Sequence, residues 1–168
     1  MNKGTLLTLQ EIYYLTSKFS YDPQTGLIVN KETNTQYISN HRRITIFFHG
    51  NQMIAAHLAW MLFFHESPLP FDVDHINTRE WDNRLANLRL ATHQQNMYNS
   101  ASNRLFKGIT KSGNSYIGAV TVDGISHRVH AKTLEEVVKL TIQLRNKLHG
   151  EFANHGTIDF NRIPPRLQ

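Results

Sequence analysis

The sequence predicts an α+β protein made of two modules, the second of them a three-stranded antiparallel sheet with one helix. Three observations support this prediction: apolar residues alternate with polar ones in some runs, recur every three or four residues in others, and the basic residues are unevenly distributed. Residues 1–100 contain eight Lys or Arg and eight Asp or Glu, whereas residues 101–168 contain ten and five. The net charge of +5 therefore belongs to the second part of the chain, which indicates a neutral module followed by a basic one.

The first part of the chain begins with short elements separated by turns. In order, we expect a helix over residues 6–19, a turn over 21–26, strands over 27–29 and 37–38, a hairpin of 43–48 with 52–56, and a helix over 57–64. The hairpin would turn at His49-Gly50-Asn51, because Gly and Asn accept the backbone conformations that tight turns need. Pro68 follows the second helix and prevents its continuation. These elements predict a β-rich N-terminal extension to the segment that follows.

A strand, a polar loop, a second strand and a helix come next. In order, we expect a strand over residues 71–76, a loop over 77–86 and a returning strand over 88–91. Thr92 and Gln95 have the spacing of a capping box, in which each side chain binds the backbone N–H of the other residue. The box predicts a helix that begins after Thr92 and carries Asn96 in its first turn.

Four polar side chains in this segment have the chemistry needed to hydrolyse a phosphodiester: Asp74, His75, Asn87 and Asn96. Carboxylate and amide oxygens suit Mg²⁺ or Mn²⁺, and histidine titrates near neutral pH, so it can accept a proton from water. The order of strand, loop, strand and helix allows Asp74 and Asn96 to converge on one ion.

Neighbouring residues offer alternatives to these roles. Asn83 and Asn99 compete for the two amide roles, and any one polar residue here, taken alone, is more simply explained as turn capping. We expect His93 to face the surface or a substrate. His57 and His65, on the preceding helix, are expected to serve packing or capping.

The third part of the chain predicts a sheet covered by one helix. We expect strands over residues 106–110, 115–122 and 127–131, a linker over 99–103 and a loosely packed tail over 156–168. Thr133 and Glu136 form a second capping box, and the apolar residues after it follow helical spacing. The helix would cover one face of the sheet, and the other face would carry some of Lys107, Lys111, Tyr116, Thr121, Arg128 and His130.

The composition excludes several classes of site. The chain has no cysteine, which excludes disulfides, thiolate zinc sites and cysteine nucleophiles. No long uncharged apolar run is present, so we expect no membrane span and a cytoplasmic location. No dimer surface is evident in the sequence, and we expect a monomer.

Residues 74–96 resemble the HNH nuclease motif, in the variant whose final histidine is replaced by asparagine and which is common in phage homing and free-standing endonucleases. The likeness covers about residues 43–99 and includes His57-Leu58-Ala59-Trp60 and the strand at 87–92. It implies a ββα-metal fold for residues 1–100. It further implies His75 as general base, Asp74 and Asn96 as ligands of one Mg²⁺ or Mn²⁺ ion, and Asn87 as the residue that orients the His75 imidazole.

Residues 104–155 resemble the DNA-binding domain of the Apetala or ethylene-response-factor type. The likeness lies in Lys107-Gly108-Ile109, in the strand at 116–120 and in the turn at Asp123-Gly124, although Tyr116 stands where tryptophan is usual. It implies that the sheet enters the DNA major groove. The predicted DNA contacts are Arg42, Arg43, Arg84 and Arg89 in the first module and Lys107, Lys111, Tyr116, Arg128 and His130 in the second.

Together these features predict a metal-dependent endonuclease that nicks or cuts double-stranded DNA. The basic second module supports a polyanionic partner independently of either resemblance. One alternative is a non-catalytic DNA-binding protein on a nuclease-like scaffold. Another is a nuclease directed at RNA or at a particular DNA structure.

Overall fold

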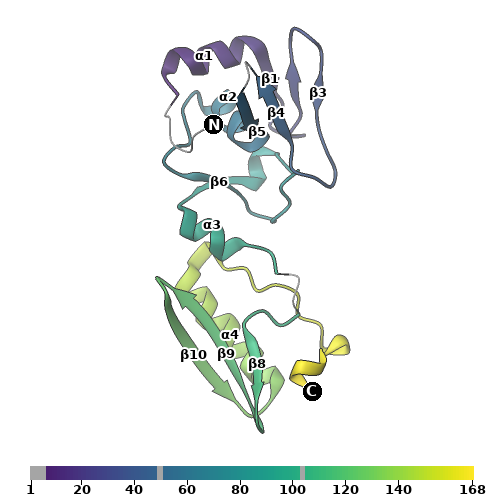
Figure 1. Cartoon of the computed structure of the whole chain (residues 1–168), viewed down its shortest axis with the longest axis vertical. Helices are drawn as coiled ribbons and strands as arrows, with labels where there is room; N and C mark the ends of the chain where they lie inside the picture. The colour runs from purple at the N-terminus through teal and green to yellow at the C-terminus, as the bar shows by residue number, and fades with distance from the viewer. Residues whose placement is uncertain (1–6, 49–50, 103–104) are drawn as a thin grey trace. The chain divides into compact units, whose positions relative to one another are not determined.

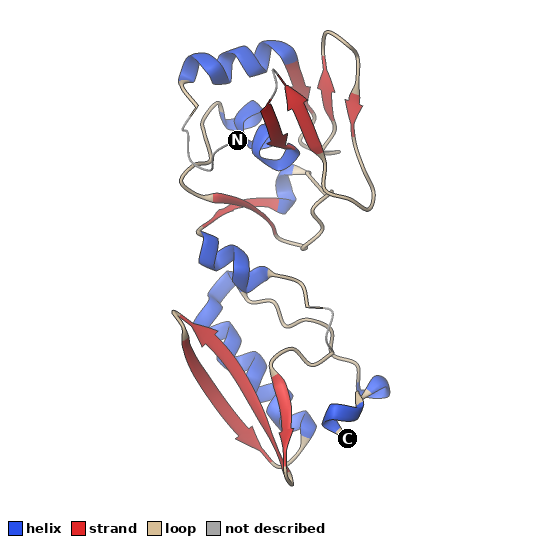
Figure 2. Ribbon diagram, in the orientation of Figure 1, coloured by secondary structure: helices blue, strands red, loops and turns tan. Residues whose placement is uncertain are grey.

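The computed structural model describes residues 7–48, 51–102 and 105–168. It divides into two compact units, Met1–Asn96 and Met97–Gln168. In the described residues, four α-helices accompany ten β-strands, and every strand pairing is antiparallel (Figure 1, Figure 2). The predicted α+β class is confirmed.

The first unit holds three small sheets around a buried helix. Its elements are α1 (Leu9–Lys18), β1 (Phe19–Tyr21), β2 (Ile28–Asn30), β3 (Gln36–Tyr37), β4 (Thr45–Phe48), β5 (Asn51–Ile54), α2 (Ala55–Phe64), β6 (Asp72–His75), β7 (Leu88–Ala91) and the first part of α3 (His93–Asn99). The sheets are β1-β2-β3, the β4-β5 hairpin and the β6-β7 pair. The tip of the predicted hairpin at His49-Gly50 lies outside the described residues.

The first helix is shorter than predicted, because the chain turns into a strand at Phe19. Thr8 and Glu11 close a capping box at the start of α1. Phe19 continues the apolar pattern of the helix, yet it pairs with Asn30 in the sheet and is buried. Tertiary pairing therefore decides the backbone conformation at this residue.

Helix α2 forms the centre of the first core. Leu58 and Ala59 have no exposed surface, and Ile46 and Ile28 from the neighbouring sheets are buried with them. A helix that is apolar on nearly all sides is stable only when other elements cover it. Strand β6 is among the elements that contact α2, so the core supports the strand that carries Asp74 and His75.

The second unit is a three-stranded sheet with a helix on one face. Its elements are β8 (Ile109–Ser112), β9 (Ser115–Val122), β10 (Ile125–Ala131) and α4 (Leu134–His149), followed by short 3₁₀ turns at Gly150–Phe152, Phe160–Arg162 and Pro165–Leu167. The strand order is β10-β9-β8, and all three strands contact α4. Thr133 caps α4 by accepting a hydrogen bond from the Glu136 N–H, which is one half of the predicted capping box.

Gly118 allows α4 to lie directly against β9. A Cβ atom on Gly118 would stand 1.8 Å from Thr141 Oγ1, which is buried in α4. The even-numbered residues near it, including the buried Val120, therefore face the helix, and the odd-numbered residues face away from it.

The C-terminal residues belong to the core of the second unit. Leu167 is 1% exposed and joins the same apolar cluster as Phe106 and Val137. The prediction of a loosely packed tail over residues 156–168 is wrong, because the buried Leu167 packs into the apolar core of the second unit.

Candidate active site

Strand β6, which pairs with β7, carries Asp74 and His75 on its two opposite faces. Asp74 pairs with Arg89 and His75 pairs with Leu88 across the ladder. Because side chains alternate along a strand, Asp72 and Asp74 share one face of β6 and His75 lies on the other.

The Asp74 carboxylate is buried and already has a cationic neighbour. Arg89 Nε donates to Asp74 Oδ2 over 2.8 Å, and the two side chains are 15% and 5% exposed. Arg89 was predicted to contact DNA, but here its guanidinium binds the predicted metal ligand. Removing one member of so buried a pair would leave the other charge poorly solvated.

Asn96 lies over the same face of β6 as Asp74. Its Nδ2 donates to Asp72 Oδ2 over 3.0 Å, and His93 Nδ1 lies 3.1 Å from the same oxygen. The predicted capping box that positions Asn96 is present, since Gln95 N–H donates to Thr92 Oγ1 and Thr92 N–H to Gln95 Oε1. Asp72 was not among the predicted site residues, although its spacing of two from Asp74 places it on the same face.

The charge of Asp72 is stabilised by these two neighbours. Burial alone would raise the pKa of Asp72, but the hydrogen bonds from Asn96 and His93 outweigh burial and hold the pKa below its usual value. An ionised carboxylate thus stands beside the predicted metal ligands.

The His75 imidazole is buried and held by an asparagine. Its Nε2 lies 3.1 Å from Asn83 Oδ1, and His75 is 9% exposed. Burial lowers the pKa of His75, against the opposing effects of the Asn83 hydrogen bond and the Asp74 charge. Histidine is therefore favoured in the neutral form that a general base requires.

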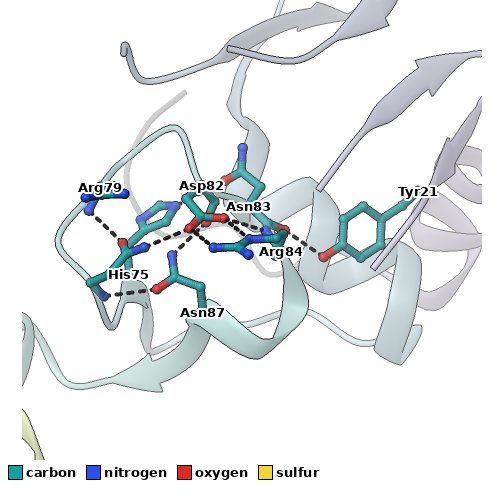
Figure 3. A network of polar contacts seen from close by, with 8 residues as sticks. Tyr21, His75, Arg79, Asp82, Asn83, Arg84 and Asn87 are labelled. Carbon is teal, nitrogen blue, oxygen red and sulfur yellow. Dashed lines mark hydrogen bonds and ion pairs between the residues drawn. The ribbon is translucent and has the colours of Figure 1, made fainter. Parts of the chain in front are cut away.

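The hydrogen bond predicted for Asn87 is made by Asn83 instead (Figure 3). The Asn87 side chain holds the loop: its Oδ1 accepts from Asn77 N–H over 2.9 Å, and its Nδ2 donates to the Asp82 carbonyl over 2.7 Å. Asn87 ends a 3₁₀ turn at Leu85–Asn87 just before β7, so its side chain points into the loop rather than toward the imidazole. Asn83 was the alternative for this role.

The N-terminal sheet braces the loop that carries Asn83. Tyr21 Oη donates to the Asn83 carbonyl over 2.7 Å (Figure 3). Leu85 N–H donates to the Pro23 carbonyl over 3.0 Å. Burial raises the pKa of Tyr21 well above its usual value, so the phenol stays a donor. Gly26 fits here because a Cβ would lie 2.8 Å from Arg84 N. No sequence signal links Tyr21 to Asn83, 62 residues away.

Helix α2 brings a second histidine near the site. Burial lowers the pKa of His57. The charge of Asp72 opposes this effect, and the charges of Arg43 and His75 add to it. His57 was expected to serve packing or capping, and its partial burial agrees with packing.

Besides Arg89, two more of the arginines predicted to contact DNA in the first unit pair with nearby carboxylates. Arg43 donates to both oxygens of Glu80, and Arg84 donates to Asp82 over 2.7 and 2.6 Å. The Arg84 guanidinium lowers the pKa of Asp82 to about 2. Arg42 is exposed.

Three residues predicted on the free face of the second sheet lie elsewhere. Tyr116 packs against the core on the α4 side, where its Oη donates to the Leu167 carbonyl, and Lys111 is its partner across the ladder. Lys111 Nζ donates to the Gln168 carbonyl over 2.6 Å, and Lys107 Nζ to the Ser100 carbonyl over 2.9 Å. Tyr116 faces the helix because it lies two residues before Gly118 on β9, and Lys111 shares this face because it pairs with Tyr116.

The face of the sheet away from α4 carries the other predicted contacts. Arg128 pairs with Ala119, and His130 pairs with Ile117. Both Arg128 and His130 are exposed. The other side chains of this face are short or polar, apart from Ile117: Thr110, Ser112, Ser115, Thr121 and Ser126. The prediction for Arg128, His130 and Thr121 thus agrees with the register.

The donor set fits a cation that needs few protein ligands. Among the residues that the structure describes, no group of three or more His, Asp or Glu is arranged to hold a metal. Mg²⁺ usually retains several waters and takes one or two protein carboxylates together with substrate oxygens. Asp74 on β6, with Asn96 of α3 over the same face, would be such a set.

Comparisons with known proteins agree with the chemistry of this site. Residues 55–98 match a family model described as HNH endonuclease. Residues 55–98 are an HNH endonuclease family domain. The matched residues include β6, β7 and most of α3.

Two viral relatives are similar over about half of this chain. The uncharacterized HNH endonuclease L560 of Acanthamoeba polyphaga mimivirus is 38% identical over 99 residues, which are 56% of this chain and 53% of that protein. Protein 3.8 of Escherichia phage T7 is 33% identical over 94 residues, which are 51% of this chain and 78% of that protein. The match thus spans about half the length of the mimivirus relative.

A solved structure that describes DNA binding and cleavage by the HNH homing endonuclease I-HmuI is also similar. It is 18% identical, with a TM-score of 0.38, and the similarity covers 75% of this chain and 76% of that one.

None of the helices in the described part of this chain combines the length and the apolar character that a membrane crossing requires.

Proposed function

We propose that the protein is a divalent-metal-dependent endonuclease that hydrolyses phosphodiester bonds in double-stranded DNA, with His75 as the general base. The observation that carries this proposal is the buried His75, held by Asn83 at the end of the strand that also carries Asp74. A neutral imidazole that donates from Nε2 to Asn83 keeps its lone pair on Nδ1, where it can accept a proton from water.

Asp74 and Asn96 would hold the cation. When bound, a divalent cation neutralises charge on the scissile phosphate and stabilises the leaving oxygen. Asp74 brings the negative charge and Asn96 a neutral oxygen, while Arg89 beside Asp74 keeps the carboxylate oriented. Asn87 would act on the loop rather than on the base, by fixing the backbone at Asn77 and Asp82.

The cleavage experiment uses purified protein and a supercoiled plasmid with Mg²⁺ or Mn²⁺. We expect nicked or linear product that EDTA abolishes, and we expect His75→Ala to lose cleavage while it still binds DNA. If His75→Ala cleaved as fast as the wild-type protein with the metal present, the assignment of the base would be wrong. DNA binding without cleavage by the wild-type protein would favour the alternative, a non-catalytic DNA-binding protein. Parallel RNA and single-stranded substrates test the choice of nucleic acid.

We propose further that the face of the β8-β9-β10 sheet away from α4 binds DNA. Its short polar side chains permit close approach of the backbone, and Arg128 and His130 lie on it. An arginine can bind a phosphate or the edge of a guanine. The resemblance to the Apetala type of domain and the basic charge of residues 101–168 support the same surface.

Matched charge removals test this surface. Arg128→Ala on the sheet face and Lys139→Ala on the exposed side of α4 each remove one positive charge. We expect Arg128→Ala to weaken DNA binding and to reduce its salt dependence, because a phosphate contact contributes to the slope of affinity against salt. Lys139→Ala should change affinity much less. Equal losses from both substitutions would show a diffuse charge effect and no particular face.

A further inference from the structure

Asp72 contacts a predicted metal ligand without being one of the residues that the proposed function uses. Its Oδ2 accepts a hydrogen bond from Asn96 Nδ2 over 3.0 Å. His93 Nδ1 lies 3.1 Å from the same oxygen, but the His93 side chain is 80% exposed, so this second contact is weakly held. The contact with Asn96 is the better protected of the two.

The contact bears on which atom of Asn96 can meet a cation. A side-chain amide has one oxygen and one NH₂ group, which exchange positions when the amide is flipped. Only the oxygen can ligate a hard cation such as Mg²⁺. An ionised carboxylate accepts hydrogen bonds and donates none. Asp72 therefore selects the orientation in which the Asn96 NH₂ group points to Asp72 and Oδ1 points away.

We propose that Asp72 is a positioning residue, which fixes the Asn96 amide so that its oxygen is presented to the metal. This inference rests on the proposed function, because it assigns Asn96 to the metal. A neutral ligand next to Asp74 needs a fixed orientation. Asp72, two residues before Asp74 on the same face of β6, supplies it.

The first test is Asp72→Asn, which keeps the size of the side chain. An amide at this position can either accept from Asn96 or donate to it, so the orientation of Asn96 is no longer selected. We expect the Mg²⁺ concentration that half-saturates cleavage to rise by roughly tenfold, as is typical when the partner of a metal ligand is replaced. Cleavage at excess metal should recover, and DNA affinity should be unchanged. His93→Ala, which removes only the exposed contact, is the matched control and should shift the half-saturation little.

A second background separates positioning from other roles. In an Asn96→Asp protein the ligand has two equivalent oxygens and needs no orientation, and the Asp72 carboxylate would repel it. Asp72→Asn should then leave the metal requirement unchanged or make it lower. If Asp72→Asn raised the requirement equally in both backgrounds, Asp72 would bind the ion itself or support the fold, and the proposal would be overturned. No change in the native Asn96 background would overturn it as well.

Metal binding without DNA distinguishes this proposal from the proposed function. Titration calorimetry with Mn²⁺ reports the ion on the protein alone, and Asp72→Asn should weaken binding there by a similar factor. Mn²⁺ binding that depends on Asp72, with no cleavage of any nucleic acid, would refute the nuclease proposal and keep the positioning role. The absence of any Mn²⁺ binding by the wild-type protein, both alone and in the presence of DNA, would overturn both.

Discussion

Replacing Asn83 with alanine should impair catalysis more than it impairs the fold. Asn83 is 2% exposed, and its Oδ1 lies 3.1 Å from His75 Nε2. Loss of one buried hydrogen bond lowers the free energy of unfolding by about 1–3 kcal/mol. Loss of the partner that orients a functional histidine lowers the rate by roughly 10- to 100-fold, which corresponds to about 1.4–2.7 kcal/mol of activation free energy.

Two measurements separate these effects. Urea unfolding gives the stability of Asn83→Ala, and single-turnover plasmid cleavage at saturating metal gives its rate under conditions in which the variant is folded. Tyr21→Phe is the matched control, because it removes the 2.7 Å hydrogen bond to the Asn83 carbonyl and leaves the amide side chain in place. We expect Tyr21→Phe to lose about 1 kcal/mol of stability with a much smaller loss of rate. A wild-type rate for folded Asn83→Ala would refute the view that Asn83 orients the base.

Three further outcomes test the packing and electrostatics of both units. Gly118→Ala should lower the free energy of unfolding by about 1–3 kcal/mol, because its Cβ would clash with Thr141 Oγ1. In combination with Thr141→Ala the two losses should be less than additive in chemical denaturation, and strict additivity would contradict the clash. Thr133→Ala should cost about 0.5–2 kcal/mol in the same assay through the lost cap of α4; an unchanged midpoint would show that the cap adds nothing. Because the pKa of Asp82 is lowered in the folded state to about 2, its contribution is fully present above pH 4 and is lost as the pH falls toward 2. This contribution should be about 1 kcal/mol after screening of the exposed Arg84. Asp82→Asn should make the free energy of unfolding less dependent on pH in that window. An unchanged slope would show that the pair contributes nothing.

Local patterns were sufficient to predict β9 and the caps that begin α3 and α4, but the first strand of the second sheet, predicted over residues 106–110, lies at Ile109–Ser112. Strand β9 covers the predicted residues 115–122, and the caps at Thr92 and Thr133 form as their spacing indicates. These features depend on residues that are close together in the chain, so alternation, turns and capping boxes are enough to find them.

Contacts between distant residues account for what the sequence did not reveal. The path of the loop before β7 depends on Tyr21 and Pro23, and that path decides whether Asn83 or Asn87 reaches His75. The face that Tyr116 occupies depends on the register of three strands under α4, and residue type alone favoured the wrong face for it. The contact between Asp72 and Asn96 likewise depends on the packing of α3 over β6.

Alternate residues of strand β9 are constrained differently, because one set packs against α4 and the other faces away from it. Gly118 admits no larger side chain without moving α4, whereas Ile117, Ala119 and Thr121 face away from the helix. Substitutions at these outward positions need not repack the core, so a lineage can exchange them freely while the unit still folds. If this face reads DNA, the preferred target can drift from one descendant to another without any change in the residues that cut.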